Sequence, residues 1–230
     1  MSWEPSQFLD SGETEHWALF RDLPHVWDAL PRIKDYLKEN LRPGMHGQYL
    51  GSPEQVFLES DHVFIGEGTV VEPGAVIKGP AWIGANCQIR PGAYVRGNVI
   101  IGDNCVIGNS CEFKNCVLFN GAQVPHFSYV GDSILGAGAH LGAGVICSNL
   151  KLNGEEVVLR TAEGDSIPTG LRKFGAVLGD HAEAGCNSVL NPGSILGRQS
   201  LVYPGVAWRG ILPAKHLGKR VGEIVPRRDR

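Results

Sequence analysis

Residues 65–124 repeat every six positions, and this period most limits the possible folds. Ten consecutive hexads begin with Ile, Val or Phe, and in nine of the ten the fifth place holds Thr, Ala, Cys or Val. A strand repeats its buried side chains every two residues and a helix every 3.6, so neither fits as one continuous element. The period therefore predicts a solenoid in which each hexad supplies a short strand and a corner. Glycine tolerates the backbone of such corners, and most of the 31 glycines follow residue 65.

Three hexads make one coil of about 18 residues, in which the first residue of each hexad points inward. The repeat resumes after residue 130 and again from Leu178, which predicts about six or seven coils. The pattern resembles that of the hexapeptide-repeat proteins, and the resemblance implies a left-handed coil. We therefore expect an all-β solenoid, a left-handed parallel β-helix of hexapeptide repeats with an N-terminal helical cap and a projecting loop.

The chain divides into a pre-repeat segment (1–58), the β-helix (59–212) and a basic C-terminal tail (213–230). In the first segment, apolar residues recur at helical spacing, namely Leu30, Ile33, Leu37 and Leu41. We expect this helix to cap the open end of the coil, because solenoids need a polar cover there.

An insertion, residues 150–174, interrupts the repeat and is expected to project from one corner. Asn153-Gly154 within it predicts a hairpin turn.

Composition excludes several classes of function. The net charge of -3 at pH 7 provides no broad basic field, so a nucleic-acid partner is not expected. The sequence contains neither a secretory signal nor a long apolar run, which favours a cytoplasmic protein without a membrane segment. Six cysteines form no CxxC pair, and Cys87, Cys105 and Cys111 take the small fifth place as core residues.

The stretch GAQVPHFSYVGDS, residues 121–133, breaks the regular pattern. We expect a bulge that turns His126 and Tyr129 towards a groove. The motifs EFKN, HFSYVGD, LGAG and SNL are similar to those of the acetyltransferase domain of the bacterial bifunctional glucosamine-1-phosphate acetyltransferase / N-acetylglucosamine-1-phosphate uridyltransferase family. The resemblance covers about residues 60–212. The Gly-rich loop of the uridyltransferase half is not found, so no pyrophosphorylase activity is expected.

The resemblance implies that His126 is the general base of acetyl transfer. An imidazole with a pKa near neutrality suits the removal of a proton from an attacking amine. The alternative is a histidine at a bulge that only hydrogen-bonds backbone.

Arg96 and Lys114 are one coil apart and both follow an inward residue, so they are expected to point outward side by side. Two like charges this close favour a bridging anion, and the resemblance implies the phosphate of a sugar. The alternative is two solvated surface charges. The resemblance also places further residues at the acceptor, namely Glu112, Tyr129, His140 and Asn149, with Lys173 reaching in from a neighbouring subunit of a homotrimer.

Acetyl-CoA is the acyl donor that the resemblance implies, and no metal is required for the transfer. Ala143 and Cys186 match positions along the pantetheine arm, and Tyr203 and Pro204 lie in a later coil that also contacts CoA. His140 stands where the family has asparagine, and the residues after Asn149 differ as well. These differences leave the acceptor open between an amino-sugar phosphate, a nucleotide sugar and a hydroxyl group.

Two classes of function follow. The first is an acyltransferase that moves an acetyl group from acetyl-CoA to an amino group of a sugar phosphate or nucleotide sugar. The second is a non-catalytic trimeric module that binds such a ligand on the same scaffold. A zinc-dependent hydrase of this fold needs three converging histidines, and the spacing of His126, His140 and His181 does not match it.

Overall fold

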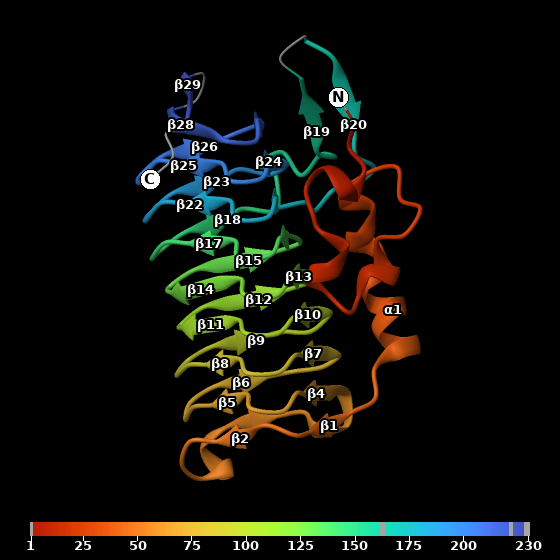
Figure 1. Ribbon diagram of the computed structural model, residues 1–230, viewed down its shortest axis with the longest axis vertical. Helices are drawn as coiled ribbons and strands as arrows, with labels where there is room; N and C mark the ends of the chain where they lie inside the picture. The colour runs from red at the N-terminus through yellow and green to blue at the C-terminus, as the bar shows by residue number, and fades with distance from the viewer. Residues whose placement is uncertain (1, 162–163, 221–222, 228–230) are drawn as a thin grey trace.

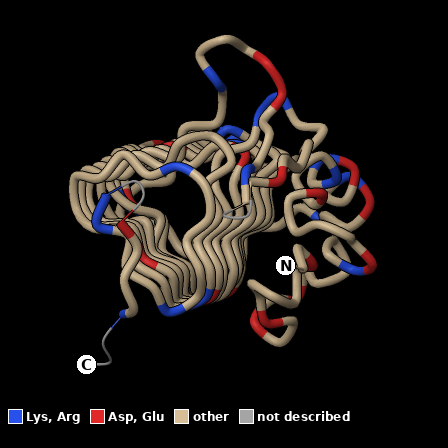
Figure 2. The backbone as a smooth tube through the Cα atoms, turned by 90° about the horizontal axis from the view of Figure 1, so that it is seen from above, with Lys and Arg blue, Asp and Glu red and all other residues tan. Residues whose placement is uncertain are grey.

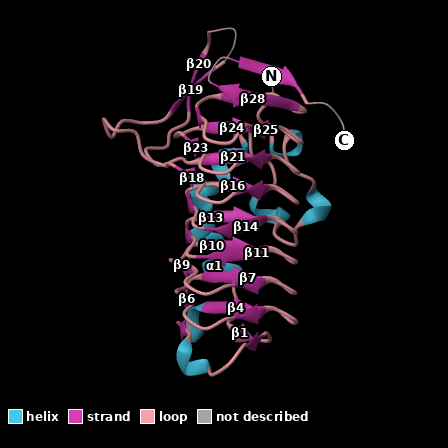
Figure 3. Ribbon diagram, turned by 90° about the vertical axis from the view of Figure 1, so that its left-hand side faces the viewer, coloured by secondary structure: helices cyan, strands magenta, loops and turns pink. Residues whose placement is uncertain are grey.

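The computed structural model describes residues 2–161, 164–220 and 223–227, and it is a parallel β-solenoid (Figure 1). This confirms the expected left-handed β-helix. Three sheets form the sides of the coil, and strands one coil apart pair in parallel along each of them. Figure 3 shows the strands stacked along the axis with loops at the corners.

Sheet A, in order, contains β1 (Gly44–Met45), β4 (Val63–Ile65), β7 (Ala81–Ile83), β10 (Val99–Ile101), β13 (Cys116–Leu118), β16 (Ile134–Leu135), β21 (Ala176–Leu178), β24 (Ser194–Leu196) and β27 (Ile211–Leu212). Sheet B contains β2 (Gln48–Tyr49), β5 (Val70–Val71), β8 (Gln88–Ile89), β11 (Val106–Asn109), β14 (Gln123–His126), β17 (His140–Leu141), β22 (Glu183–Ala184), β25 (Leu201–Val202), β28 (His216–Arg220) and the antiparallel β29 (Glu223–Pro226). Sheet C contains β3 (Phe57–Leu58), β6 (Val76–Ile77), β9 (Tyr94–Val95), β12 (Glu112–Lys114), β15 (Tyr129–Gly131), β18 (Ile146–Cys147), β23 (Val189–Leu190) and β26 (Ala207–Trp208).

The coil is longer than the hexads predict. Sheet A has nine strands, so the expectation of about six or seven coils is wrong. Residues 44–58 already pair in parallel with the next coil, and β28 pairs with β25 within the segment expected to be a tail. These end coils lack the hexad signature because open-end positions are only partly buried, as at Met45 and Tyr49.

The N-terminal segment lies beside the coil and does not cap its end. It comprises the α-helix α1 (Ile33–Asn40) and four 3-10 turns, Pro5–Gln7, Ser11–Glu13, Trp17–Leu19 and Val26–Arg32; two further 3-10 turns, Pro53–Gln55 and Ser60–His62, lie among the first coils. Seen down the axis, this segment covers one side of the stacked coils (Figure 2). No helix among the described residues has the length and apolar character needed to cross a membrane.

The expected end cap is wrong because the outer face of sheet A is apolar. In the middle of this face the outward side chains are fully buried and belong to one cluster with the N-terminal segment, as at Ile100, Val117 and Phe119. Phe20 meets Phe119 with ring centroids 5.3 Å apart. An apolar sheet face needs cover more than the coil end does, so the amphipathic segment packs there.

The insertion does contain a hairpin, but not at Asn153-Gly154. Strands β19 (Val158–Arg160) and β20 (Ser166–Pro168) pair in antiparallel fashion further along. At the expected site, Gly154 N–H donates to the Lys151 carbonyl at 2.9 Å, which closes a turn between segments that do not pair with each other. An Asn-Gly pair forms a hairpin only where paired strands flank it, and here they do not.

The break in the hexads is not a bulge at His126. Asn109 pairs with His126 in a regular ladder. Paired residues in neighbouring coils are 18 positions apart in the sequence for Ala81 and Val99. The separation is 17 positions for Val99 and Cys116, and again for Val117 and Ile134. The missing residues fall at the next corner, between sheets C and A, where Asn115 and Asp132 each make the turn in left-handed conformation. The stretch is therefore irregular because two successive coils are shortened.

The contact between the N-terminal segment and sheet A makes a stability prediction. Phe119→Ala removes a fully buried ring and should lower the free energy of unfolding by about 3–5 kcal/mol. Phe57→Ala, at a ring that is 53% exposed, is the matched control and should change it by less than about 0.5 kcal/mol. Denaturant titration measures both, and equal losses would contradict the assigned packing.

His16 makes the stability of this contact depend on pH. Burial lowers the pKa of His16 from 6.5 to about 4, although the nearby Asp103 carboxylate opposes the shift. Its Nδ1 meets Tyr36 Oη at 3.1 Å, Glu15 lies 3.7 Å from Nε2, and the ring meets Trp82 edge-on.

Between pH 6.5 and 4 the unfolded chain binds a proton at His16 that the folded chain does not. Stability from this group is therefore complete above pH 6.5 and falls as pH drops towards 4, by on the order of 3 kcal/mol. His16→Phe should flatten that part of the pH profile of the unfolding midpoint. An unchanged slope would contradict a neutral, buried His16.

Candidate functional site

Four of the site residues expected from the sequence, together with Asn109, form one column at the corner between sheets B and C. Register places Asn109 beside His126, and the same register continues through the next coils. The column is Asn109, His126, Ala143, Cys186 and Pro204. It holds the proposed base and three of the four positions expected to contact CoA, and we call it the corner column. Tyr203 precedes Pro204 and is exposed beside it.

Backbone hydrogen bonds fix the spacing of the corner column. The His126 carbonyl accepts from Gly144 N–H at 3.1 Å, and the Ala143 and Cys186 carbonyls accept from the next coils at 2.8 Å each. The His126 side chain is exposed, and no described side chain hydrogen-bonds its ring. The corner thus presents an imidazole to the outside of the coil.

Phe127, next to the corner column, stands in an unusual backbone state. Its φ is +51° and its side chain is 60% exposed. The equivalent positions in the adjoining coils are Ser110 and Gly144, which are small and also left-handed. A bulky residue in this region is strained by about 1–2 kcal/mol, and such strain gathers at functional sites.

The outer face of sheet C carries the expected acceptor residues together. Tyr94, Glu112 and Tyr129 occupy one outward row, one coil apart, and Arg96 and Lys114 occupy the next. Arg96 Nη1 lies 2.8 Å from Glu112 Oε1, and Lys114 Nζ lies 3.1 Å from Asp132 Oδ1. Each of the two cations therefore has a carboxylate partner within the chain. Binding of an external phosphate by Arg96 and Lys114 stays a prediction.

Asp132 and Asn149 complete this face. The Asn149 side-chain amide donates to Tyr129 Oη at 3.2 Å and also to the Asp132 carboxylate. Burial, with the Asp132 and Glu112 carboxylates nearby, raises the pKa of Tyr129. Gly131 leaves the room for this contact, because a Cβ there would collide with Tyr129 Oη and Asn149 Nδ2. The sequence analysis did not single out Asp132 as a site residue.

Two expected acceptor residues lie away from this face within one chain. His140 begins β17 on sheet B, where it is half-buried, and Lys173 is exposed at the neck of the insertion, bridged to Leu150. His126, His140 and His181 lie on different parts of the coil. Among the described residues, no three His, Cys, Asp or Glu side chains gather as a metal site would need.

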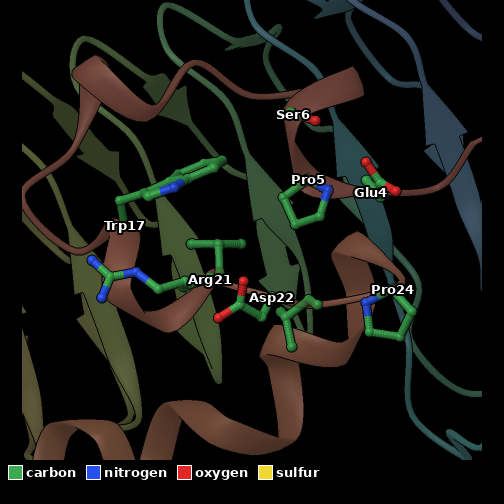
Figure 4. Close-up of a pocket in the computed structure, with 9 residues that line it drawn as sticks. Glu4, Pro5, Ser6, Trp17, Arg21, Asp22 and Pro24 are labelled. Atoms are coloured by element: carbon green, nitrogen blue, oxygen red, sulfur yellow. The ribbon is translucent and has the colours of Figure 1, made fainter.

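A groove of about 610 Å³ lies beneath the insertion. It is continuous with the outward row of sheet C that contains Lys114. It is lined by Ser148, Leu150, Lys151, Leu152, Asn153, Val157, Val158, Asn191, Pro192 and Arg209. A separate pocket of about 510 Å³ lies wholly within the N-terminal segment, where its lining includes Pro5, Trp17, Arg21, Asp22 and Pro24 (Figure 4). Only the first is continuous with the outer face of sheet C.

The strain at Phe127 is testable without any ligand. Phe127→Gly should make the protein about 1 kcal/mol more stable than Phe127→Ala, because alanine keeps the Cβ that disfavours a φ of +51°. Both variants remove the same exposed ring, so denaturant midpoints isolate the backbone effect. Equal midpoints would contradict the left-handed assignment.

Comparison with known proteins agrees with this arrangement of the fold. Residues 77–163 match the GMPPB C-terminal domain. The chain is 34% identical over 183 residues to the "Bifunctional protein GlmU" of Methanococcus maripaludis, which covers 80% of this chain and 43% of that protein. The chain thus spans less than half the length of the bifunctional relatives it matches. A UDP-N-acetylglucosamine acyltransferase structure from Arabidopsis has a TM-score of 0.45 at 14% identity, covering 80% of this chain and 74% of that one, which is too distant to support an argument.

A relative of similar length matches almost throughout. The chain is 35% identical over 201 residues to the putative uncharacterized acetyltransferase YaiX of Escherichia coli K12, covering 83% of this chain and 85% of that protein. The chain therefore belongs to the family of hexapeptide-repeat acetyltransferases that includes YaiX.

Proposed function

We propose that the chain transfers an acetyl group from acetyl-CoA to an amino group of a sugar phosphate or nucleotide sugar. The observation that carries this proposal is the corner column, in which His126 is continuous with two small residues, the half-buried Ala143 and the exposed Cys186. A pantetheine arm is narrow and extended, so a column of small residues along the coil axis suits it. The polar face of sheet C lies directly around the corner.

In the proposed reaction the acceptor amine attacks the thioester carbonyl of acetyl-CoA. The imidazole of His126 takes the proton that the nitrogen loses, and the CoA sulfur leaves and is protonated as the thiol. Exposure of His126 to the ligand side lets it reach the amine. No metal ion takes part in this sequence of steps.

The acceptor lies on the outer face of sheet C in this proposal. Arg96 and Lys114 hold its phosphate, which must compete with Glu112 and Asp132 for them. Arg96 is the more exposed of the two cations, so it is the easier one to recruit. The groove beneath the insertion, with Asn191 and Arg209, accommodates the remainder of a nucleotide sugar.

A homotrimer follows from the same proposal. The corner column is open on its outer side, so a second subunit must supply the other wall of the CoA groove. His140 and Lys173, which one chain keeps away from sheet C, then reach the acceptor from that neighbour. The unpaired cysteines, of which Cys186 is exposed, suit the reducing cytoplasm.

The direct test is thiol release from acetyl-CoA with a panel of amino-sugar phosphates and nucleotide sugars. His126→Asn should lower kcat by roughly 10²- to 10⁴-fold, because a general base contributes about that much. His181→Asn is the matched control at the other corner of sheet B; its exposed histidine also has a positive φ that asparagine tolerates. It should leave turnover unchanged.

The competing function is a binding module without catalysis. The absence of a described side chain that orients the His126 ring favours this alternative. Binding of an acceptor by calorimetry without thiol release from any panel member would replace the enzyme proposal with the module. Equal turnover in wild type and His126→Asn would remove His126 as the base.

A further inference from the structure

Asp132 is a buried carboxylate behind the outer face of sheet C. It is 4% exposed and turns the shortened corner between sheets C and A with a φ of +47°. Register places it in a column with two amides, Asn115 one coil before and Asn149 one coil after. We call this column the amide ladder.

Both oxygens of the Asp132 carboxylate accept from two side chains each. Oδ1 accepts from Lys114 Nζ at 3.1 Å and from Asn115 Nδ2 at 3.0 Å. Oδ2 accepts from Lys114 Nζ at 3.2 Å and from Asn149 Nδ2. An ionised carboxylate only accepts, so it selects the NH₂ side of each amide and draws the ammonium inward.

This selection fixes the orientation of two groups that reach the outer face. Asn149 turns its NH₂ towards Asp132 and Tyr129 Oη, so its carbonyl oxygen is turned away from them. Lys114 is held close to the sheet, with its side chain 26% exposed. Asn115 also donates to the Leu30 carbonyl at 3.4 Å, which anchors the ladder to the N-terminal segment.

We propose that Asp132 is a positioning residue for the acceptor side of the reaction, resting on the function proposed above. It touches no ligand itself, since it is buried behind Gly131 and Lys114. Its ionised carboxylate holds Lys114 and Asn149 in the one arrangement that meets the acceptor. The corner column is on the other edge of sheet C, so the donor side does not depend on Asp132.

Asp132→Asn separates this role from simple packing. Asparagine has the same size and tolerates a positive φ, so the backbone of the corner is kept. It offers one acceptor oxygen where three donors converge, so Lys114 and Asn149 lose their fixed arrangement. The Michaelis constant for the acceptor should rise about 10- to 100-fold, the loss expected for charge-assisted hydrogen bonds. That for acetyl-CoA should stay within about twofold.

Asp180→Asn is the matched control. Asp180 is 6% exposed, pairs with Arg198 at 3.4 Å and accepts from Ala137 N–H at 2.9 Å, but it lies at the corner between sheets A and B. The same chemical change there should leave both Michaelis constants unchanged. Equal rises for acceptor and acetyl-CoA in Asp132→Asn, or no rise, would overturn the positioning role.

Asn115→Gly provides a second variant should Asp132→Asn fail to fold. Asn115 meets the acceptor side only through Asp132, and glycine accepts its φ of +49°. It should raise the Michaelis constant for the acceptor alone, by a smaller factor than Asp132→Asn. An unchanged constant in Asn115→Gly would count against the ladder.

A readout that needs no activity keeps this inference separate from the proposed function. Asp132 contributes to the raised pKa of Tyr129, so Asp132→Asn should lower that pKa. Ultraviolet titration of each protein against its Tyr129→Phe partner isolates this phenol. If the wild type transfers no acetyl group, the proposed function fails. Independently of that result, a Tyr129 pKa that is the same in Asp132→Asn as in the wild type would overturn the ladder.

Discussion

Backbone hydrogen bonding between successive coils is the constraint on which the rest of this structure depends. Each strand pairs in parallel with the strand one coil before and after it, so residues with the same place in the coil stand in columns. The fully buried aliphatic residues inside hold those columns in register. Functional side chains on this scaffold are therefore arranged in columns along the coil axis. Two residues that are 17 or 18 positions apart in the sequence are neighbours in such a column.

Two of those columns lie along opposite edges of sheet C. The corner column bears His126 and the small residues suited to an extended thioester ligand, and the amide ladder supports Lys114 and Asn149 from behind. The amide ladder forms at the shortened corners of Asn115 and Asp132. Each of these corners turns with one left-handed residue, whereas the corresponding corner of an earlier coil uses two, Gly97 and Asn98. Under the proposed function, the irregular stretch in the sequence serves the acceptor side through Asp132.

The hexads predict the solenoid because large aliphatic residues at every sixth position have few other packing solutions. They miss the end coils, whose partly exposed residues are not selected so strictly. They also miss the position of the N-terminal segment, although a signal was present: strands of sheet A read as unbroken apolar runs, as at Val99–Ile101 and Cys116–Leu118. Such runs indicate strands buried on both faces.

For the site, family motifs predicted which residues gather on sheet C and at the corner, and the one-coil spacing places Arg96 beside Lys114. The ion pairs could not be predicted, because Glu112 and Asp132 reach the cations from different columns. The positions of His140 and Lys173 away from this face follow from the sheet to which each belongs, which motif matching does not reveal.

The most direct measurement is a crystal structure of the protein with coenzyme A. The pantetheine arm should lie along Ala143, Cys186 and Pro204 with its thiol beside His126. A coenzyme A molecule bound elsewhere on the coil, or none bound at concentrations that saturate related acetyltransferases, would contradict it.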